Sequence, residues 1–213
     1  MNFISEELEG YVANHSQVEP QLLKELDIET HQKIMQPRML SGHFQGRVLS
    51  MLSKIINPKH ILEIGTYTGY AALCLAEGLQ KDGTLDTIDI NEELVEIQEK
   101  YFGLSEYKEQ IKTHLGDALE IIPNLNKIFD LVFIDADKEN YINYFNMIVP
   151  MMNKGGIILS DNVLWSGKVL EELNPKDTST KVLVEYNKLI NEDSRVETVL
   201  LPIRDGLTVT RVL

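Results

Sequence analysis

The chain has 213 residues, of which 43% are hydrophobic and 25% charged, and its formal net charge is −13. This length fits one domain over residues 1–213, and because no apolar run is long enough to cross a membrane, we expect a soluble protein without a membrane partner. The acidic composition disfavours nucleic acid as a partner, because binding to phosphate backbones requires concentrated Lys and Arg side chains.

The N-terminal stretch and the cysteine content favour a cytoplasmic location. Residues 1–12 are acidic and lack the basic and apolar regions of a secretory signal. Cys74 is the only cysteine, so no intrachain disulfide can form, and we expect this side chain to pack inside a helix.

Helices and strands are predicted in two groups along the chain. Residues 1–57 contain two amphipathic helices, over 19–35 and 44–56. From residue 58 onward, short apolar strands alternate with helices. The strands are predicted at 60–65, 84–90, 111–115, 129–136 and 155–162, and the helices between them at 70–79, 91–103, just after the third strand, and 140–152. Asn91 is the predicted N-cap of its helix.

This alternation predicts an α/β fold with a parallel sheet covered by helices. The C-terminal residues 196–213 break the pattern, because two β-rich runs there are joined by Arg204, Asp205 and Gly206 as in a hairpin. We therefore expect an antiparallel pair of strands to close one edge of the sheet. Residues 163–180, with Trp165, Gly167 and Pro175, predict a covering loop.

Polar residues follow every strand of the predicted parallel sheet. Ligands of such sheets bind beyond the carboxyl ends of the strands, so these residues are expected to share one site. They are Glu63, Gly65, Thr66 and Gly69 at the first strand, Asp89 at the second, Asp117 and Ala118 at the third, Asp135, Asp137 and Lys138 at the fourth, and Asp161 and Asn162 at the fifth.

The turn EIGTYTG after the first strand indicates an adenosine-type cofactor. Gly65 and Gly69 lie four positions apart, a spacing that permits a tight strand-to-helix turn close to a ligand. Asp89 follows Gly65 by 24 positions, where a carboxylate can accept hydrogen bonds from both hydroxyls of a ribose. Capping of the next helix is the alternative for Asp89. Dinucleotide and sulfonium cofactors both fit these features.

Charge separates these two cofactor classes. Glu63 precedes the glycines, where it would repel a pyrophosphate but attract the amino group and the sulfonium of S-adenosylmethionine. Asp117 and Ala118 supply a carboxylate acceptor and a backbone amide at the depth expected for an adenine. We therefore expect S-adenosylmethionine.

The fourth and fifth strand ends predict a metal site. Asp135, Asp161 and Asn162 offer two carboxylates and an amide carbonyl, which suit Mg²⁺, with Ca²⁺ or Mn²⁺ as alternatives. Lys138 lies close by in the sequence. The competing interpretation is that these aspartates are ordinary polar strand ends that cap helices.

Several segments together resemble the cation-dependent class I O-methyltransferases, the group of catechol O-methyltransferase, plant caffeoyl-CoA O-methyltransferases and many bacterial relatives. The resemblance extends from about Met39 to the C-terminus and rests on EIGTYTGYAAL, DTIDIN, FDLVFIDADKENY, SDNVLWSG and LPIRDGLTVTRV. It implies a Rossmann-like core over 58–213, with a mostly parallel seven-stranded sheet, an antiparallel C-terminal hairpin, helices on both faces and an N-terminal helical extension. It also implies a homodimer.

The resemblance also implies a role for each site residue. Asp135, Asp161 and Asn162 correspond to metal ligands, and Lys138 corresponds to the catalytic base. The residues expected to bind the cofactor are Met39, Ser41, Glu63, Gly65, Thr66, Gly69, Ala71, Asp89, Asp117, Ala118 and Asp135. Asp137, Trp165 and Ser166 are the predicted substrate contacts, and core packing is the alternative for Trp165.

The predicted activity is methyl transfer from S-adenosylmethionine to a hydroxyl of a catechol-like small molecule, with S-adenosylhomocysteine as the second product. Chelation of two vicinal hydroxyls by the cation favours loss of a hydroxyl proton near neutral pH. Lys138, as a neutral amine, would accept this proton, whereas a surface lysine is the alternative. Much of the rate is expected from alignment of oxygen, methyl carbon and sulfur.

Three other functions stay open at this point. The first is O-methylation of a tRNA hydroxyuridine, which the acidic composition disfavours. The second is an NAD-dependent oxidoreductase, which lacks support because the G-x-G-x-x-G pattern is absent and Glu63 is present. The third is a non-catalytic module that binds a divalent cation.

Overall fold

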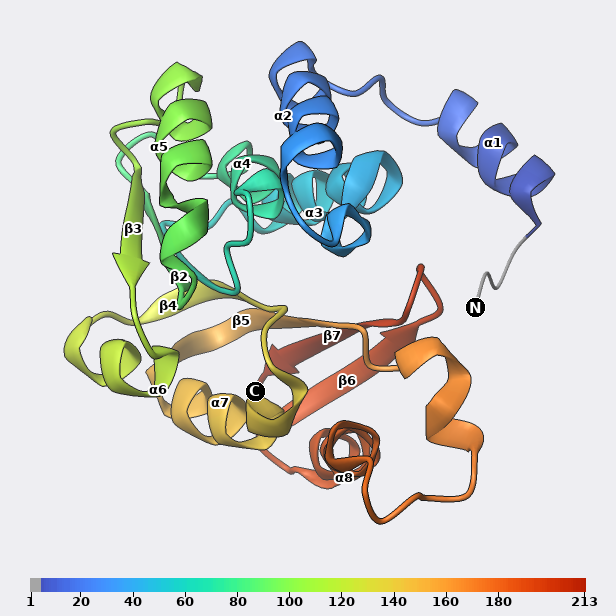
Figure 1. Ribbon diagram of the computed structural model, residues 1–213. Helices are drawn as coiled ribbons and strands as arrows, with labels where there is room; N and C mark the ends of the chain where they lie inside the picture. Colours follow the sequence, from blue (N-terminus) through green and yellow to red (C-terminus); the bar gives the residue numbers. More distant parts are fainter. Residues whose placement is uncertain (1–4) are drawn as a thin grey trace.

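A seven-stranded sheet forms the centre of the computed structural model, which describes residues 5–213 (Figure 1). The strand order is β3-β2-β1-β4-β5-β7-β6. The strands are β1 His60–Ile64, β2 Thr84–Asp89, β3 Ile111–Leu115, β4 Phe129–Ile134, β5 Met152–Asp161, β6 Val196–Leu201 and β7 Leu207–Val212.

Strands β1 to β5 are parallel, and β7 runs antiparallel to both β5 and β6. The predicted α/β class and the antiparallel C-terminal hairpin are therefore confirmed. The strand order reverses between β1 and β4, because the chain first builds outward to β3 and then returns to the other side of β1. Ligand crevices of open α/β sheets lie at such a reversal, outside the carboxyl ends of the strands.

Two layers of helices cover the sheet, one on each face (Figure 1). The first layer contains α2 Gln21–Lys33, α3 Gly42–Ile56, α4 Tyr70–Ala76 and α5 Val95–Leu104, and the second contains α6 Ala118–Ile121, α7 Tyr141–Ile148 and α8 Thr178–Glu192. Each layer buries its own apolar cluster against the sheet, with Leu49 and Phe102 in the first and Phe145 and Tyr186 in the second. Such burial is the main stabilising contribution to this type of fold.

The N-terminal helices differ in how much they pack against the rest of the protein. Leu23 and Leu26 of α2 and Leu49 of α3 are buried in the first core cluster, whereas α1 Glu6–Asn14 lies apart from the sheet (Figure 1). The predicted helical extension thus contains two helices that build the core and one that stands outside it. Cys74 is buried in α4, as expected from its position in an apolar helix.

Short 3₁₀ segments adjoin several of these elements. They are η1 Pro37–Met39, η2 Glu92–Leu94, η3 Ile122–Asn124, η4 Lys138–Asn140, η5 Val149–Met151 and η6 Trp165–Leu170. Asn91 caps η2 by accepting a hydrogen bond from the backbone N–H of Glu93 at 3.0 Å, so the predicted N-cap is confirmed. Within residues 5–213, no helix has the length and apolar content that crossing a membrane requires.

Helix α8 is the main element that the sequence prediction missed. Residues 163–180 were expected to form a loop, and no helix was expected between this loop and the hairpin. The structure instead begins α8 at Thr178, after an N-cap in which Asp177 accepts from the backbone N–H of Thr180 at 3.0 Å. Leu183, Tyr186 and Ile190 follow at helical spacing and are buried, so the periodic signal was present in the sequence.

Candidate active site

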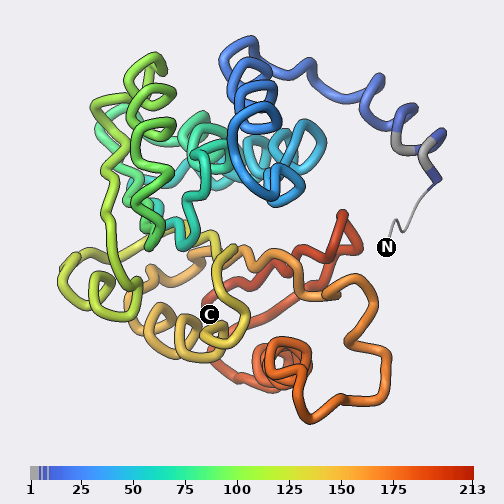
Figure 2. Tube along the Cα trace, viewed as in Figure 1, coloured from blue at the N-terminus to red at the C-terminus, as the bar shows by residue number. Residues whose placement is uncertain are grey.

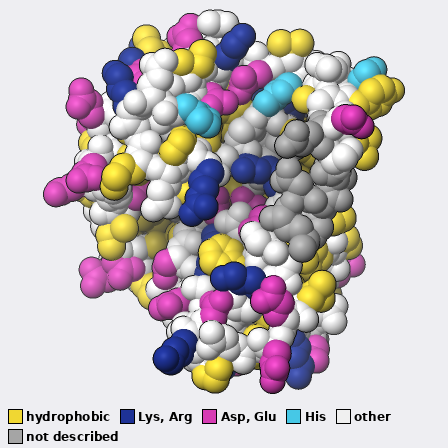
Figure 3. All heavy atoms as spheres, turned by 45° about the vertical axis from the view of Figure 1, so that its right-hand side comes forward, with side chains coloured by type: hydrophobic (Ala, Val, Ile, Leu, Met, Phe, Trp, Pro, Cys, Tyr) yellow, Lys and Arg dark blue, Asp and Glu magenta, His cyan; other side chains and the backbone are white. Residues whose placement is uncertain are grey.

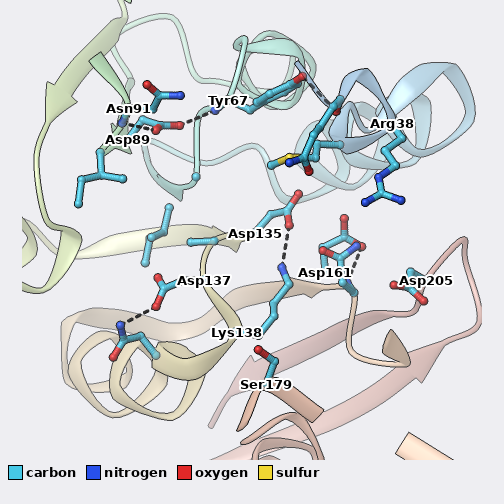
Figure 4. A pocket seen from close by; sticks show the side chains of 18 of the residues that line it. Arg38, Tyr67, Asp89, Asn91, Asp135, Asp137, Lys138, Asp161, Ser179 and Asp205 are labelled. Atoms are coloured by element: carbon cyan, nitrogen blue, oxygen red, sulfur yellow. Dashed lines mark hydrogen bonds and ion pairs between the residues drawn. The ribbon is translucent and has the colours of Figure 1, made fainter. Parts of the chain in front are cut away.

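The carboxyl ends of the parallel strands open onto a cavity of about 1690 Å³ (Figure 4). The ends of all five parallel strands, the segment Pro37–Met39, and the turn between β6 and β7 contribute to its wall. A pocket for one drug-sized ligand usually measures about 300–1,000 Å³. The cavity therefore has room for two small molecules side by side.

Most of the residues predicted to bind a cofactor line this cavity or a small recess beside it. Met39, Gly65, Asp89, Asp117, Ala118 and Asp135 line the large cavity. Ser41, Thr66 and Ala71 line a recess of about 20 Å³, whose wall also includes Met39, Gly65 and Asp135. Glu63 and Gly69 line neither space.

Backbone N–H groups hold the two carboxylates on the β2 and β3 side. Asp89 accepts hydrogen bonds from the N–H of Tyr67 at 2.7 Å and from the N–H of Asn91 at 2.8 Å. Asp117 caps α6 by accepting from the N–H of Leu119 at 2.8 Å. Amide donors stabilise an ionised carboxylate without taking its charge away. Both side chains are thus oriented acceptors for polar groups of a ligand.

Glu63 lies below the cavity, within the sheet. The residue is completely buried, and the hydroxyl of Thr87 donates a hydrogen bond to its carboxyl group. Burial raises the pKa of Glu63 well above its ordinary value of 4.5, and the charges of Asp135 and Asp89 act in the same direction. The expected direct contact between Glu63 and a sulfonium therefore has no support from its position.

The two glycines of the turn serve the packing of the protein itself. Gly65 has φ +97°, and a β-carbon there would collide with the carbonyl oxygen of Asp135 on the neighbouring strand end. Gly69 has φ +92°, and a β-carbon would lie 2.6 Å from the ring of Phe102. The nearest neighbour of a β-carbon at Gly69 is thus an aromatic ring of the core, and the expected approach of the Gly69 backbone to a ligand stays a prediction.

Strand ends β4 and β5 bring Asp135, Asp161 and Asn162 to the same cavity wall (Figure 4). Asp161 is 3% exposed and accepts hydrogen bonds from Gln45 Nε2 at 2.6 Å and from the N–H of Asn162 at 2.8 Å. Burial, together with the charge of Asp135, raises the pKa of Asp161 to about 7. The two carboxylates are thus close enough to repel each other.

This donor set fits a divalent cation. Two mutually repelling carboxylates and the amide oxygen of Asn162 are hard ligands of the kind that Mg²⁺, Ca²⁺ and Mn²⁺ prefer. In the part of the chain that the structure describes, no group of three or more His, Cys, Asp or Glu side chains is suited to a metal. An ion at this site would therefore rely on the amide of Asn162 and on open positions for water or substrate.

Lys138 is held between the two strand ends. The residue is 8% exposed, and its Nζ donates to Asp135 Oδ1 at 3.1 Å and to the hydroxyl of Tyr141 at 2.8 Å. The hydroxyl of Tyr141 in turn donates to the carbonyl oxygen of Asp161 at 2.8 Å. The alternative of a surface lysine is wrong, because this side chain is buried and lines the cavity.

The predicted substrate contacts also line the cavity, and they come from two loops. Asp137 accepts hydrogen bonds from Asn140 Nδ2 at 2.6 Å and from the hydroxyl of Tyr144. Trp165 and Ser166 belong to η6, where φ is +47° and +55°. Trp165 also packs partly against the second core cluster, as the alternative of core packing predicts, and its contact with a substrate stays a prediction.

Two residues of this site were not predicted from the sequence. Tyr141 follows Lys138 by three positions, and helical spacing was a usable signal for their contact. Gln45 contacts Asp161 across 116 positions of sequence, a proximity that only the folded chain reveals.

Comparison with known proteins assigns the chain to a family. A family model described as O-methyltransferase matches residues 13–213. The chain is 36% identical over 207 residues to caffeoyl-CoA O-methyltransferase 5 of Nicotiana tabacum, an alignment that covers 91% of this chain and 85% of the relative. The chain belongs to the O-methyltransferase family. This membership confirms the predicted resemblance and favours methyl transfer over the oxidoreductase alternative.

Solved structures of methyltransferases share this fold closely. The SAH-bound methyltransferase PaMTH1 of Podospora anserina has a TM-score of 0.89 and 27% identity, with 100% of this chain and 98% of that chain covered. The O-methyltransferase TomG of Streptomyces achromogenes, involved in tomaymycin synthesis and solved in complex with SAM, has a TM-score of 0.89 and 26% identity, with 97% and 96% covered. The predicted Rossmann-like methyltransferase fold is therefore confirmed.

Proposed function

We propose that this O-methyltransferase moves a methyl group from S-adenosylmethionine to one hydroxyl of a small catechol-like molecule, with the help of a divalent cation such as Mg²⁺. The observation that carries the proposal is the presence of Asp135, Asp161, Asn162 and Lys138 on one wall of a cavity large enough for two molecules. The caffeoyl group in the names of the plant relatives is itself a vicinal diol, which supports this class of acceptor.

The β1 to β3 side of the cavity is the proposed cofactor side. Asp89 offers its carboxylate to ribose hydroxyls, and Asp117 and Ala118 line the wall where an adenine would lie. Met39 and Ser41 approach the same region from the segment before α3. The solved relatives that hold SAM or SAH support this choice of cofactor.

Asp135, Asp161 and Asn162 are the proposed ligands of the cation. When bound, a divalent cation lowers the pKa of a hydroxyl that coordinates it. The protein contributes a buried and mutually repelling pair of carboxylates, whose charge a cation would neutralise. Asn162 adopts φ +59°, a left-handed conformation that asparagine tolerates better than most residues.

Lys138 is the proposed base that accepts the proton of the acceptor hydroxyl. Its Nζ faces the cavity wall from between Asp135 and Tyr141, and lies 5.9 Å from the ring centroid of Trp165. Because the Tyr141 proton is donated to the carbonyl of Asp161, Tyr141 can only accept from Lys138. Tyr141 and Asp135 therefore each accept one N–H of the neutral Lys138 amine, and its lone pair is left to accept the proton of the acceptor hydroxyl.

The decisive experiment combines a substrate screen with a variant. Methyl transfer would be measured on catechols, on monophenols and on bulk tRNA, with EDTA and after Mg²⁺ is restored. We expect transfer to catechols, loss of transfer in EDTA, and recovery with Mg²⁺. Transfer to tRNA alone, or equal transfer to monophenols in EDTA, contradicts the proposal.

The variant Lys138→Met tests the base separately. We expect methyl transfer to fall by about 100-fold or more, within the range attributed to general base catalysis, while SAH affinity stays close to that of the wild type. Unchanged turnover would assign the proton transfer to another group. Unchanged turnover together with unimpaired binding leaves the cation and cofactor sites of the proposal intact.

A homodimer is part of the same proposal. Met51 and Ile55 of α3 are 57% and 73% exposed, and an apolar pair of this kind on a helix is suited to contact with a second copy. Light scattering would give about twice the chain mass of 24.3 kDa for a dimer. A monomer mass at micromolar concentration contradicts it.

A further inference from the structure

A buried amide side chain holds one oxygen of Asp161. Gln45, on α3, is 1% exposed, and its Nε2 donates to Asp161 Oδ2 at 2.6 Å. The other oxygen of Asp161 accepts from the N–H of Asn162 at 2.8 Å. Both oxygens of this carboxylate are thus held by neutral donors, which orient the group without neutralising its charge.

Arg204 determines which way the Gln45 amide points. Arg204 lies in the turn between β6 and β7, and Figure 2 shows this turn reaching toward the N-terminal helical layer. Its Nη1 donates to Gln45 Oε1 at 3.1 Å, to the carbonyl oxygen of Leu40 at 2.9 Å, and to the carbonyl oxygen of Ser41. A guanidinium has only donors, so the oxygen of the amide must face Arg204 and its NH₂ must face Asp161.

We propose that Gln45 is a positioning residue for Asp161, oriented by Arg204, and that this pair prepares the carboxylate to bind the cation. The inference rests on the proposed function, because it assigns Asp161 to a metal. Neutral donors suit this task, since a cationic partner would compete with the metal for the carboxylate. Residues that orient metal ligands in this way typically change metal affinity about 10–100-fold when they are replaced.

The same contacts could serve only to tie α3 and the β6–β7 turn to the end of β5. The two roles differ in their consequences. A structural tether affects the free energy of unfolding with or without metal, whereas a positioning residue changes the affinity for the cation. Cation affinity in the absence of turnover is therefore the deciding measurement.

The test uses Gln45→Met, which keeps the approximate volume of the side chain and removes both hydrogen bonds. Mn²⁺ binding to the full chain would be measured by calorimetry with saturating SAH, and SAH affinity would be measured separately. We expect Mn²⁺ affinity to fall by about 10–100-fold and SAH affinity to stay within about twofold of the wild type. Methyl transfer by the variant should recover at high Mg²⁺ concentration.

Gln110→Met is the matched control. The Gln110 side chain also donates two hydrogen bonds, to the carbonyl oxygens of Gln80 and Gly83 at 2.9 and 3.0 Å, but at the amino-terminal end of the sheet. This variant should lose a comparable amount of stability and keep the wild-type Mn²⁺ affinity. Equal loss of Mn²⁺ affinity in both variants would overturn the proposal, because it would indicate a general effect of destabilisation.

Arg204→Met and Arg204→Lys keep the proposal testable where Gln45→Met does not fold. Arg204→Met frees the amide to turn, so we expect weaker Mn²⁺ binding, whereas Arg204→Lys retains a donor and should retain most of the affinity. If Gln45→Met and Arg204→Met both keep the wild-type Mn²⁺ affinity, the positioning role of Gln45 is refuted, but the proposed metal site is not. A wild-type protein that binds no cation refutes the proposed metal chemistry as well.

Discussion

The two sides of the cavity carry carboxylates in opposite environments. On the β2 and β3 side, Asp89 and Asp117 each bind backbone N–H groups of the adjacent turn. On the β4 and β5 side, Asp135 and Asp161 bind the side chains of Lys138 and Gln45, although Asp161 also accepts from the backbone N–H of Asn162, and the two carboxylates repel each other. Backbone donors are part of the fold, whereas side-chain partners can move when a ligand arrives.

This difference suggests what each side is built to bind. A carboxylate that backbone amides have already stabilised remains a good acceptor for neutral hydroxyl and amino groups. Two carboxylates in mutual repulsion gain most from a cation.

Figure 3 shows Lys and Arg side chains gathered in the middle of one face of the molecule, although the net charge is −13. The net charge of the chain therefore does not describe the local charge on this face of the molecule.

Asp161→Asn should have the largest effect on one side of the cavity, by weakening cation binding while leaving SAH binding nearly unchanged. The variant keeps the shape of the side chain but removes the charge and one hard oxygen ligand. We expect Mn²⁺ affinity and Mg²⁺-dependent methyl transfer to fall by more than about 100-fold, beyond the loss typical of residues that only orient a ligand. Calorimetry with saturating SAH measures the first quantity, and SAH affinity itself should change little.

Asp89→Asn is the counterpart on the other side. SAH affinity should fall by about 10–150-fold, because a charged hydrogen-bond acceptor is worth about 1.5–3 kcal/mol, while Mn²⁺ affinity stays unchanged. If Asp89→Asn weakened the cation and Asp161→Asn spared it, the assignment of the two sides would be reversed.

Gly65→Ala should disturb both sides of the cavity, because Gly65 follows β1 and packs against Asp135 at the end of β4. Its positive φ and the collision of a β-carbon with the Asp135 carbonyl oxygen predict a loss of about 2–5 kcal/mol of unfolding free energy. Chemical denaturation measures this loss. Gly103→Ala is the control, since no atom lies within 4 Å of a β-carbon there and alanine favours a helix by about 1 kcal/mol.

The sequence was sufficient to predict the parallel sheet, the C-terminal hairpin and the strand ends that share the cavity. Those features depend on short-range patterns, such as apolar runs that end in Asp135 or Asp161. Helix α8 was missed although Leu183, Tyr186 and Ile190 repeat at helical spacing, because residues 181–195, between the predicted loop and the predicted hairpin, were assigned no element.

The orientation of site residues was harder to predict than their presence. The sequence predicted that Glu63 and Gly69 contact the ligand because both lie in the turn motif. Strand β1 is buried from Ile61 to Ile64, which includes Glu63, and a β-carbon at Gly69 would meet the ring of Phe102. Gln45 reaches Asp161, and Arg204 reaches Gln45, from remote segments, and no local pattern indicates these contacts.

Tyr141→Phe should affect the β4 and β5 side alone. The variant removes the hydroxyl that accepts from Lys138 and donates to the Asp161 carbonyl. We expect kcat to fall by about 10–100-fold, because small misplacements of a reacting group have effects of this size, and the unfolding free energy to fall by about 1 kcal/mol. Steady-state kinetics and chemical denaturation measure the two effects.

Tyr186→Phe is the matched control for Tyr141→Phe. Tyr186 is equally buried, its ring packs edge-on to Tyr141 at 5.4 Å, and its hydroxyl pairs with Ser160 at 2.6 Å. A similar loss of stability with unchanged kcat is expected. Equal losses of kcat in the two variants would show that Tyr141 acts through core packing.

Glu63 lies on β1, between the two sides of the cavity. We expect its contribution to the free energy of unfolding to be smaller than the effects above and to depend on pH. Its pKa is raised in the folded protein above the ordinary value of 4.5, chiefly by burial. A carboxyl with a raised folded-state pKa contributes its full stability below about pH 4.5 and loses that contribution as the pH rises toward the folded-state value. The amide of Gln carries no proton that can be lost over this range.

Glu63→Gln should therefore flatten the pH dependence of stability. Near pH 4 the unfolding free energies of the variant and the wild type should agree within about 1 kcal/mol, because a buried neutral acid and a buried amide make similar hydrogen bonds. Above pH 4.5 the variant should become progressively the more stable protein. Urea denaturation between pH 4 and pH 8 measures the difference. A wild type that gains stability relative to the variant as the pH rises would show that ionised Glu63 is stabilised in the fold, and that its negative charge is available to a cationic cofactor after all.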